Sequence, residues 1–120
     1  NWSGVVGEIP PPSLFEEGLS KDDGLMLYFG HGGGQVCFSR RQIETMSGGQ
    51  GGTFCSCKAS VILMGCSSGR LVSVNRKHTE STKEFPLYYD PEGISISYLC
   101  AGAPCVVGNL WDVTDHDIDR

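Results

Sequence analysis

The segment LMLYFGHGGG, residues 25–34, decides the fold of this chain and carries its first reactive side chain. The apolar run 25–29 is typical of a strand that is buried on both faces of a parallel sheet. His31 follows this run and stands between Gly30 and Gly32. Because glycines give almost no steric cover, we expect the His31 imidazole to be presented at the edge of the sheet.

A second segment, ASVILMGCSSG, residues 59–69, has the same layout. Its apolar run 59–64 predicts another buried strand, and the Gly-Cys-Ser sequence that follows presents the Cys66 thiol at the strand end. A cysteine hydrolase needs a thiol beside an imidazole, since the thiolate is the nucleophile and the imidazole holds its proton. The sequence therefore predicts Cys66 as nucleophile and His31 as base.

The backbone around these two side chains offers groups that would stabilise a reaction intermediate. The N–H groups of Gly32 and Cys66 are predicted to donate to the developing oxyanion. If a helix begins at Ser67 or Ser68, the positive end of its dipole would lower the pKa of the Cys66 thiol. The predicted oxyanion hole and nucleophile therefore belong to one site.

The remaining elements place this pair of residues in an α/β domain. Further elements are expected as a third buried strand at 105–110 and as helices at 13–20, at 39–46 and after Asp90. Strands that alternate with helices in this order indicate a parallel sheet with right-handed crossovers. Ligands of such sheets bind beyond the carboxyl ends of the strands, where His31, Cys66 and an aspartate-rich segment all fall.

Two of the expected helix starts carry capping signals. Ser13 is expected to cap the first helix, with Glu16 completing a capping box. Asp90 followed by Pro91 is a typical start for the third helix, with Asp90 as its N-cap and the proline at its first position. These signals predict where the chain enters each helix.

Length and charge bound the class of protein. At 120 residues the chain has room for one domain, and we expect residues 1–120 to be a partial domain of a longer protein, cut at both ends. The net charge of −5 argues against direct binding to nucleic acid, which needs clustered Lys and Arg. No apolar stretch reaches the ~18 residues of a membrane span, so no membrane partner is expected.

The chain has six cysteines, an even number that three disulfides would use. Cys66, Cys100 and Cys105 lie in apolar runs, however, where free thiols behave as small buried hydrophobes. Cys55 and Cys57 are too close together for the usual zinc spacing. We therefore expect reduced thiols in an intracellular compartment, with a disulfide or a metal site as the alternatives.

Aspartates crowd the end of the chain, at Asp112, Asp115, Asp117 and Asp119. A carboxylate pairs bidentately with a guanidinium, so this group predicts an acidic pocket for a basic substrate side chain. A simpler interpretation is a solvated helix N-terminus, where the helix dipole favours carboxylates. A calcium loop is a further alternative, although its central glycine is missing.

A rival interpretation uses the same glycine-rich segments. Residues 65–69 match the Gly-x-Ser-x-Gly elbow of esterases, and residues 31–34 match the oxyanion loop of some of them. Ser67 would then be the nucleophile, with His116 and an aspartate completing a triad. The two motifs lie too close together for the intervening elements of that fold, which counts against this interpretation. An inactive scaffold that only binds partners is the third possibility.

Five segments taken together resemble the separase family of caspase-like cysteine peptidases. They are WSGVVG (2–7), YFGHG (28–32), MGCSSG (64–69), AGAP (101–104) and GNLWDVTDHDIDR (108–120). The last segment is long and unusual, so a chance match is implausible. The resemblance leaves out the glycine tract 48–52 and the loop 75–89.

This resemblance implies a caspase-like α/β domain, part of a C-terminal protease domain, with His31 and Cys66 as its dyad. It implies cleavage after arginine in the kleisin subunit of cohesin, which releases sister chromatids at anaphase, and inhibition by a securin-like partner. Asp119 is the implied reader of the substrate arginine, and no metal or organic cofactor is implied. His116 stands where relatives tend to carry arginine, which affects surface contacts rather than the chemistry. The implied location is the nucleus and cytoplasm.

Overall fold

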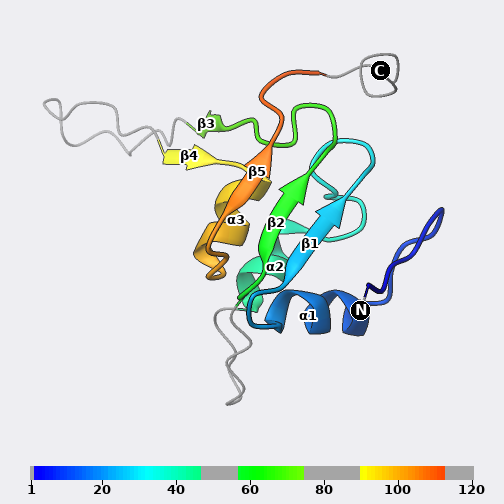
Figure 1. The fold of residues 1–120 in the computed structure, drawn as a ribbon. Helices are drawn as coiled ribbons and strands as arrows, with labels where there is room; N and C mark the ends of the chain where they lie inside the picture. Colours follow the sequence, from blue (N-terminus) through cyan, green and yellow to red (C-terminus); the bar gives the residue numbers. More distant parts are fainter. Residues whose placement is uncertain (1, 47–56, 75–89, 113–120) are drawn as a thin grey trace, which may run out of the picture.

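A three-stranded parallel sheet forms the centre of the computed structural model, which describes residues 2–46, 57–74 and 90–112. Its strands are β1 (Leu25–Tyr28), β2 (Ser60–Leu63) and β5 (Val106–Gly108), in the order β1-β2-β5. All three point the same way (Figure 1). The expected α/β class and parallel sheet are confirmed, and each strand is shorter than its apolar run.

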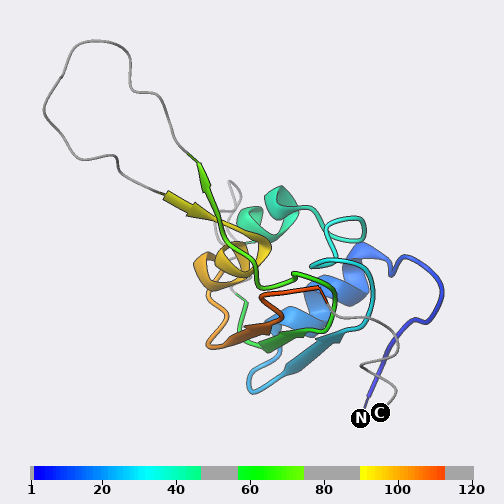
Figure 2. The same ribbon diagram turned by 90° about the horizontal axis from the view of Figure 1, so that it is seen from above.

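Within the part of the chain that the structure describes, helices cover one face of this sheet, so strands buried on both faces are not found there. The helices are α1 (Pro12–Ser20), α2 (Arg40–Thr45) and α3 (Ile94–Cys100), and they lie on the same side of the sheet (Figure 2). On the opposite face, Leu27, Ile62 and Val107 lie side by side in register. Leu27 is 40% exposed and Val107 is 48% exposed. None of the helices in the described part of the chain is long and apolar enough to cross a membrane.

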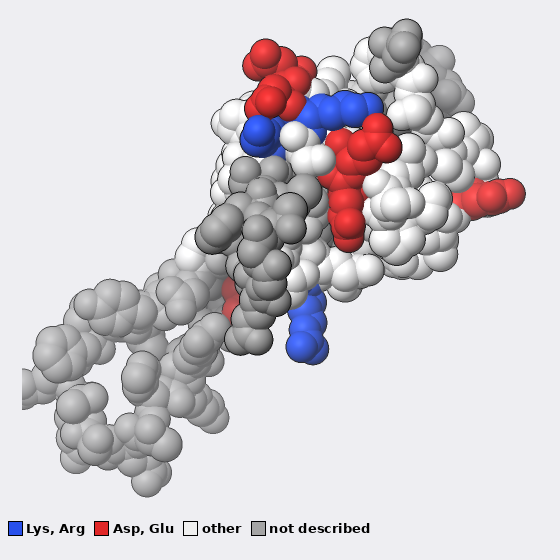
Figure 3. All heavy atoms as spheres, turned by 90° about the horizontal axis from the view of Figure 1, so that it is seen from below, with Lys and Arg blue, Asp and Glu red and all other residues white. Residues whose placement is uncertain are grey.

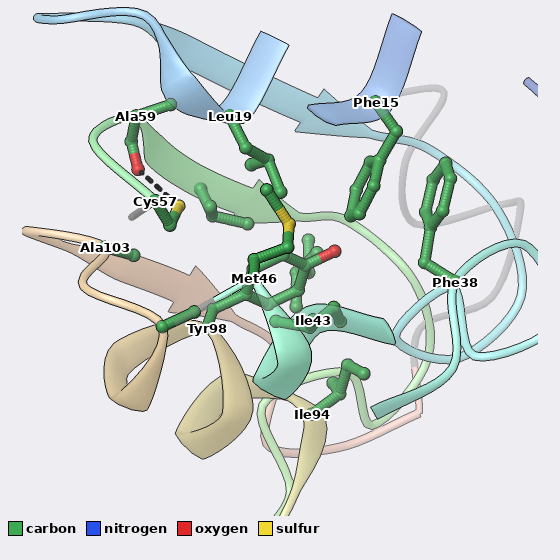
Figure 4. Close-up of a cluster of buried hydrophobic side chains, with 13 residues drawn as sticks. Phe15, Leu19, Phe38, Ile43, Met46, Cys57, Ala59, Ile94, Tyr98 and Ala103 are labelled. Carbon is green, nitrogen blue, oxygen red and sulfur yellow. Dashed lines mark hydrogen bonds between the residues drawn. The ribbon is translucent and has the colours of Figure 1, made fainter. Parts of the chain in front are cut away.

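The core fills the space between the sheet and the helices (Figure 4). Val61 and Leu63 of the central strand are fully buried, and so are Leu19 of α1 and Ile43 of α2. Tyr98 of α3 is also buried, and this burial is the main cause that raises the pKa of its phenol. A ring this large at the centre of the core fixes α3 against the sheet by the apolar area that it buries.

The start of α2 agrees with its sequence, whereas the start of α1 does not. The Ser39 side chain accepts a hydrogen bond from the Gln42 N–H, and the Gln42 side chain accepts one from the Ser39 N–H, which is a complete capping box. Helix α1 instead begins at Pro12, and no side chain caps it. The proline fixes a helical φ at this position, so Pro11 is the N-cap and Ser13 already lies inside the helix.

This difference gives a prediction about stability. Ser39→Ala is expected to lower the free energy of unfolding by about 1 kcal/mol, because it removes the hydroxyl that accepts the hydrogen bond of the Gln42 N–H. Ser13→Ala is the matched control, and we expect it to change this free energy by less than about 0.5 kcal/mol. Urea unfolding of both variants measures the difference. Equal effects would contradict the assigned caps.

A small antiparallel ribbon lies beside the main sheet and was not expected. Strand β3 (Val72–Val74) pairs with β4 (Asp90–Glu92), and helix α3 begins only after Gly93. The prediction that Asp90 caps this helix is therefore wrong. Pro91 pairs opposite Ser73 in a two-stranded ribbon, whose edges tolerate a residue without an N–H.

The described cysteines form no disulfide with one another, and only Cys57 among them is a buried core residue; Cys66, which was also expected in the core, is half-buried. Cys57 is buried, and burial raises the pKa of its thiol. Cys100 and Cys105 are exposed, although both lie in apolar runs of the sequence. Cys100 ends α3 and Cys105 follows its turn, so both lie at the margin of the helical layer rather than inside it.

Charged side chains of both signs lie close together on the face drawn in Figure 3. Ion pairs in the described part of the chain include Lys58 with Asp22 at 2.8 Å and Lys21 with Glu17 at 3.2 Å. This face therefore differs from the one-signed basic surface that is typical of proteins that bind a phosphate backbone.

Candidate active site

The two predicted catalytic residues follow neighbouring parallel strands. His31 comes shortly after the end of β1 at Tyr28, and Cys66 shortly after the end of β2 at Leu63. Because the strands are parallel and adjacent, their carboxyl ends meet at the same edge of the sheet (Figure 1). The structure therefore brings both segments to one edge, as expected.

Gly65 shows how closely these two segments approach each other. A Cβ atom built on Gly65 would overlap the carbonyl oxygen of Gly32 and would lie 2.5 Å from that of Gly30. The Met64 N–H also donates a hydrogen bond of 2.8 Å to the carbonyl oxygen of Tyr28. The residue before Cys66 thus touches the backbone on both sides of His31, and only glycine fits there.

Tyr28, the last residue of β1, holds the segment around His31. Its hydroxyl donates a hydrogen bond of 2.9 Å to the carbonyl oxygen of His31. The ring lies against Gly34, where an added Cβ would come within 3.3 Å of it. Burial raises the pKa of the Tyr28 phenol. The sequence does not point to Tyr28, because a strand tyrosine alone gives no sign that its hydroxyl folds back onto the next loop.

Cys66 lies in a hydrogen-bonded turn, so the expectation of a helix at Ser67 or Ser68 is wrong. The Ser68 N–H donates to the Gly65 carbonyl oxygen at 3.3 Å, and the Arg70 N–H donates to that of Ser67 at 3.0 Å. Ser67 has a φ of 50°, which interrupts a right-handed helix. The chain then continues into β3. No helix begins within residues 66–74, so none there places its dipole at the Cys66 thiol.

Asp112, one of the predicted pocket residues, contacts this turn directly. Its carboxylate accepts a hydrogen bond of 2.6 Å from the Ser67 hydroxyl. The other three predicted aspartates and His116 lie outside the described residues. The structure therefore joins Asp112 to the residue that follows the predicted nucleophile, a contact that the sequence analysis did not anticipate.

Gly32, one of the two predicted oxyanion donors, differs from its neighbour Gly33 in the hydrogen bonding of its backbone N–H. Within residues 2–46, 57–74 and 90–112, the Gly32 N–H makes no hydrogen bond, whereas the next N–H, of Gly33, donates to the Gln35 side chain at 3.0 Å. Gly32 itself has a φ of 59°, in the region that favours glycine. Its N–H is therefore available for a ligand, and the role of Gly32 and Cys66 as oxyanion donors stays a prediction.

A cavity of about 380 Å³ opens beside the Cys66 turn. Ser67 and Ser68 line one side of it, and Arg40, Arg70 and Glu92 contribute charged groups. Arg40 and Glu92 form an ion pair of 2.9 Å, which raises the pKa of the Arg40 guanidinium.

A family model described as "Separin, protease domain" matches residues 1–118. The chain belongs to the separin protease family. It is 39% identical over 119 residues to a separin of Schizosaccharomyces pombe and 36% identical over 119 residues to one of Mus musculus. Each match covers 99% of this chain and 5% of the relative, so the chain spans a small part of those proteins.

A solved structure agrees with this family membership. The Saccharomyces cerevisiae separase in a separase–securin complex matches with a TM-score of 0.65 and 31% sequence identity. The match covers 95% of this chain and 6% of that chain. It confirms the caspase-like fold that the sequence resemblance implied, while the roles of His31, Cys66 and the aspartates stay predictions.

Proposed function

We propose that this chain is the catalytic part of a cysteine endopeptidase, with Cys66 as nucleophile and His31 as base. The observation that carries the proposal is the contact of Gly65 with the backbone of Gly30 and Gly32, which brings the two segments together. Membership of the separin protease family supports the same reaction. A thiol and an imidazole on adjacent strand ends are the groups that acyl transfer to sulfur requires.

The reaction would proceed in two steps at this edge of the sheet. The Cys66 thiolate attacks the carbonyl carbon of the scissile peptide, and the N–H groups of Gly32 and Cys66 donate to the oxyanion. The carbon–nitrogen bond then breaks, and the His31 imidazolium gives its proton to the leaving amine. Water attacks the resulting thioester with His31 as base, which releases the acid and restores the thiol.

The proposed substrate is the kleisin subunit of cohesin, cut after an arginine, which would release sister chromatids at anaphase. Asp119 is the proposed partner of the arginine guanidinium, with Asp115 and Asp117 as the other candidates. Asp112 fits this role less well, because its carboxylate already accepts a hydrogen bond from Ser67. A securin-like protein is the proposed inhibitor, supported by the securin complex of the Saccharomyces cerevisiae separase. We propose action in the nucleus and cytoplasm.

The esterase interpretation is less well supported by the surroundings of Ser67. The Ser67 hydroxyl donates a hydrogen bond to the Asp112 carboxylate, which is a weak base compared with a histidine. The φ of 50° at Ser67 is similar to the strained backbone at the nucleophile elbow of a serine hydrolase. The labelling experiment therefore includes Ser67 as the alternative nucleophile.

Chemical labelling distinguishes these candidates. With iodoacetamide near neutral pH, we expect Cys66 to react at least about tenfold faster than the exposed Cys100, because His31 is the proposed base that accepts the Cys66 proton. His31→Ala should bring the Cys66 rate down to that of Cys100, while Cys57 stays unlabelled in the folded protein because it is buried and its pKa is raised. Peptide mass spectrometry of the labelled protein measures the three rates.

The same samples test the two alternatives. A fluorophosphonate should leave Ser67 unmodified. Labelling of Ser67 would support the esterase, and equal slow labelling of Cys66 and Cys100 with no reaction at Ser67 would support a scaffold without catalysis. Either result would overturn the proposed peptidase.

A further inference from the structure

The turn that carries Cys66 is bound along its far side by the segment 109–112, which follows β5. Five hydrogen bonds join the two segments. They are Ser67 N–H to Trp111 O at 2.9 Å, Gly69 N–H to Asn109 O at 2.8 Å, Ser67 Oγ to Asp112 Oδ1 at 2.6 Å, Asn109 N–H to Ser68 Oγ at 3.0 Å, and Asn109 Nδ2 to Gly65 O at 3.2 Å.

Ser67 is the residue of this turn whose backbone most needs support. Its φ of 50° lies in the left-handed region, which costs energy for a residue with a Cβ, and among the described non-glycine residues only Asp23 shares a positive φ. Ser67 is held at two points, by its N–H on Trp111 and by its hydroxyl on Asp112. A conformation that is unfavourable by itself therefore depends on partners from another strand end.

We propose that Asp112 is a positioning residue for the nucleophile: through the Ser67 hydroxyl it holds the peptide that follows Cys66, and so fixes the direction of the thiol and of the Cys66 N–H. The inference rests on the proposed peptidase function. Hydrogen bonds to a carboxylate are shorter and stronger than those between neutral groups, and the 2.6 Å distance fits this class. The exposed position of Asp112 makes that strength necessary, because water competes for the same hydroxyl.

The position of the turn explains why it needs a partner on this side. On its other side, Gly65 already lies against the backbone around His31. Cys66 therefore sits between a contact with the β1 loop and a set of hydrogen bonds to the β5 extension. Ser68 is buried and its hydroxyl donates to the Leu63 carbonyl oxygen at 2.6 Å, which ties the turn to the end of β2. Ser67 is held by the exposed side chain of Asp112, and a substitution at either residue removes this bond alone.

The experiment uses the full protein and compares Asp112→Ala, Asp112→Asn, Ser67→Ala and the double variant Asp112→Ala/Ser67→Ala. The measurements are kcat and KM on a peptide with arginine before the scissile bond, and the rate of Cys66 alkylation. We expect Asp112→Ala and Ser67→Ala each to lower kcat and the alkylation rate about tenfold with KM unchanged, since each removes one charge-assisted hydrogen bond. The double variant should be no slower than either single variant, because both remove the same bond.

Asp112→Asn separates positioning from substrate recognition. The asparagine oxygen still accepts from Ser67 but the bond loses its charge, so we expect a kcat between those of the parent protein and Asp112→Ala, with KM unchanged. A KM that rises strongly in Asp112→Asn would mean that the carboxylate binds the substrate arginine, and additive losses in the double variant would mean separate roles. Either result overturns the inference.

Two further measurements keep these outcomes clear. The melting temperature identifies a variant that has lost its fold. If Asp112→Ala is such a variant, the kinetics of Ser67→Ala and Asp112→Asn test the positioning role of Asp112 instead. Cys66→Ser reports on the proposed function separately. An active Cys66→Ser variant rejects the peptidase mechanism itself, whereas an inactive Cys66→Ser beside fully active Asp112→Ala and Ser67→Ala rejects only the positioning role.

Discussion

Cys66→Ser is expected to lower kcat/KM for cleavage after arginine by at least about 10³-fold in the full protein. A serine hydroxyl is nearly the same size as the thiol, so the turn at 65–69 should keep its shape. The hydroxyl is a much poorer nucleophile near neutral pH than a thiolate beside an imidazole. The loss should therefore appear in the chemical step and leave the folded structure intact.

The matched control for this variant is Cys100→Ser. Cys100 is exposed at the end of α3 and makes no part of the strand edge, so its replacement should leave kcat/KM within about twofold of the parent protein. Cleavage of an arginine peptide and of the kleisin subunit measures both variants. If Cys66→Ser cuts as fast as Cys100→Ser, the proposed nucleophile is wrong.

Gly65→Ala is expected to have the second large effect, on activity and stability together. The added Cβ would overlap the carbonyl oxygen of Gly32, which is backbone and has no rotamer that relieves the contact. The strand ends must then separate, and we expect a cost of about 2 kcal/mol in the free energy of unfolding. The same separation moves Cys66 away from His31, so kcat/KM should fall by about 10²-fold or more.

Gly18→Ala gives the matched control for Gly65→Ala. Gly18 lies inside α1, and a Cβ built there meets no atom within 4 Å. Alanine has the higher helix propensity, so this change should stabilise the protein by up to about 1 kcal/mol and leave activity unchanged. Thermal unfolding and peptide cleavage measure both variants. A Gly65→Ala protein that is as stable and active as the Gly18→Ala protein would show that the two loops do not pack as described.

The sequence predicted the strand ends well because apolar runs and glycines act locally. The run before His31 and the run before Cys66 each became a strand of the parallel sheet, and both residues lie at its carboxyl edge. The capping signal of α2 was equally local and is confirmed, with Ser39 and Gln42 as its two members.

Apart from the start of α1, where Pro12 displaced the Ser13 cap, the main failures concern contacts between residues that are far apart in the chain. An apolar run predicts burial but does not say how many layers cover the strand, so the exposure of Leu27 was missed. The pairing of β3 with β4 outweighed the capping signal at Asp90, because a strand partner decides the backbone of a short segment. The bond between Ser67 and Asp112 joins two strand ends, and nothing in either local sequence indicates it.

The close fit of Gly65 between the carbonyl groups of Gly30 and Gly32 also limits how the protein can be regulated. Two loops whose backbones pack together without free space are expected to move together, so a shift of the backbone at 30–32 would also shift the turn that carries Cys66. An inhibitor can then act in two ways: it can cover the carboxyl edge of the sheet, or it can separate β1 from β2, which carry the two loops.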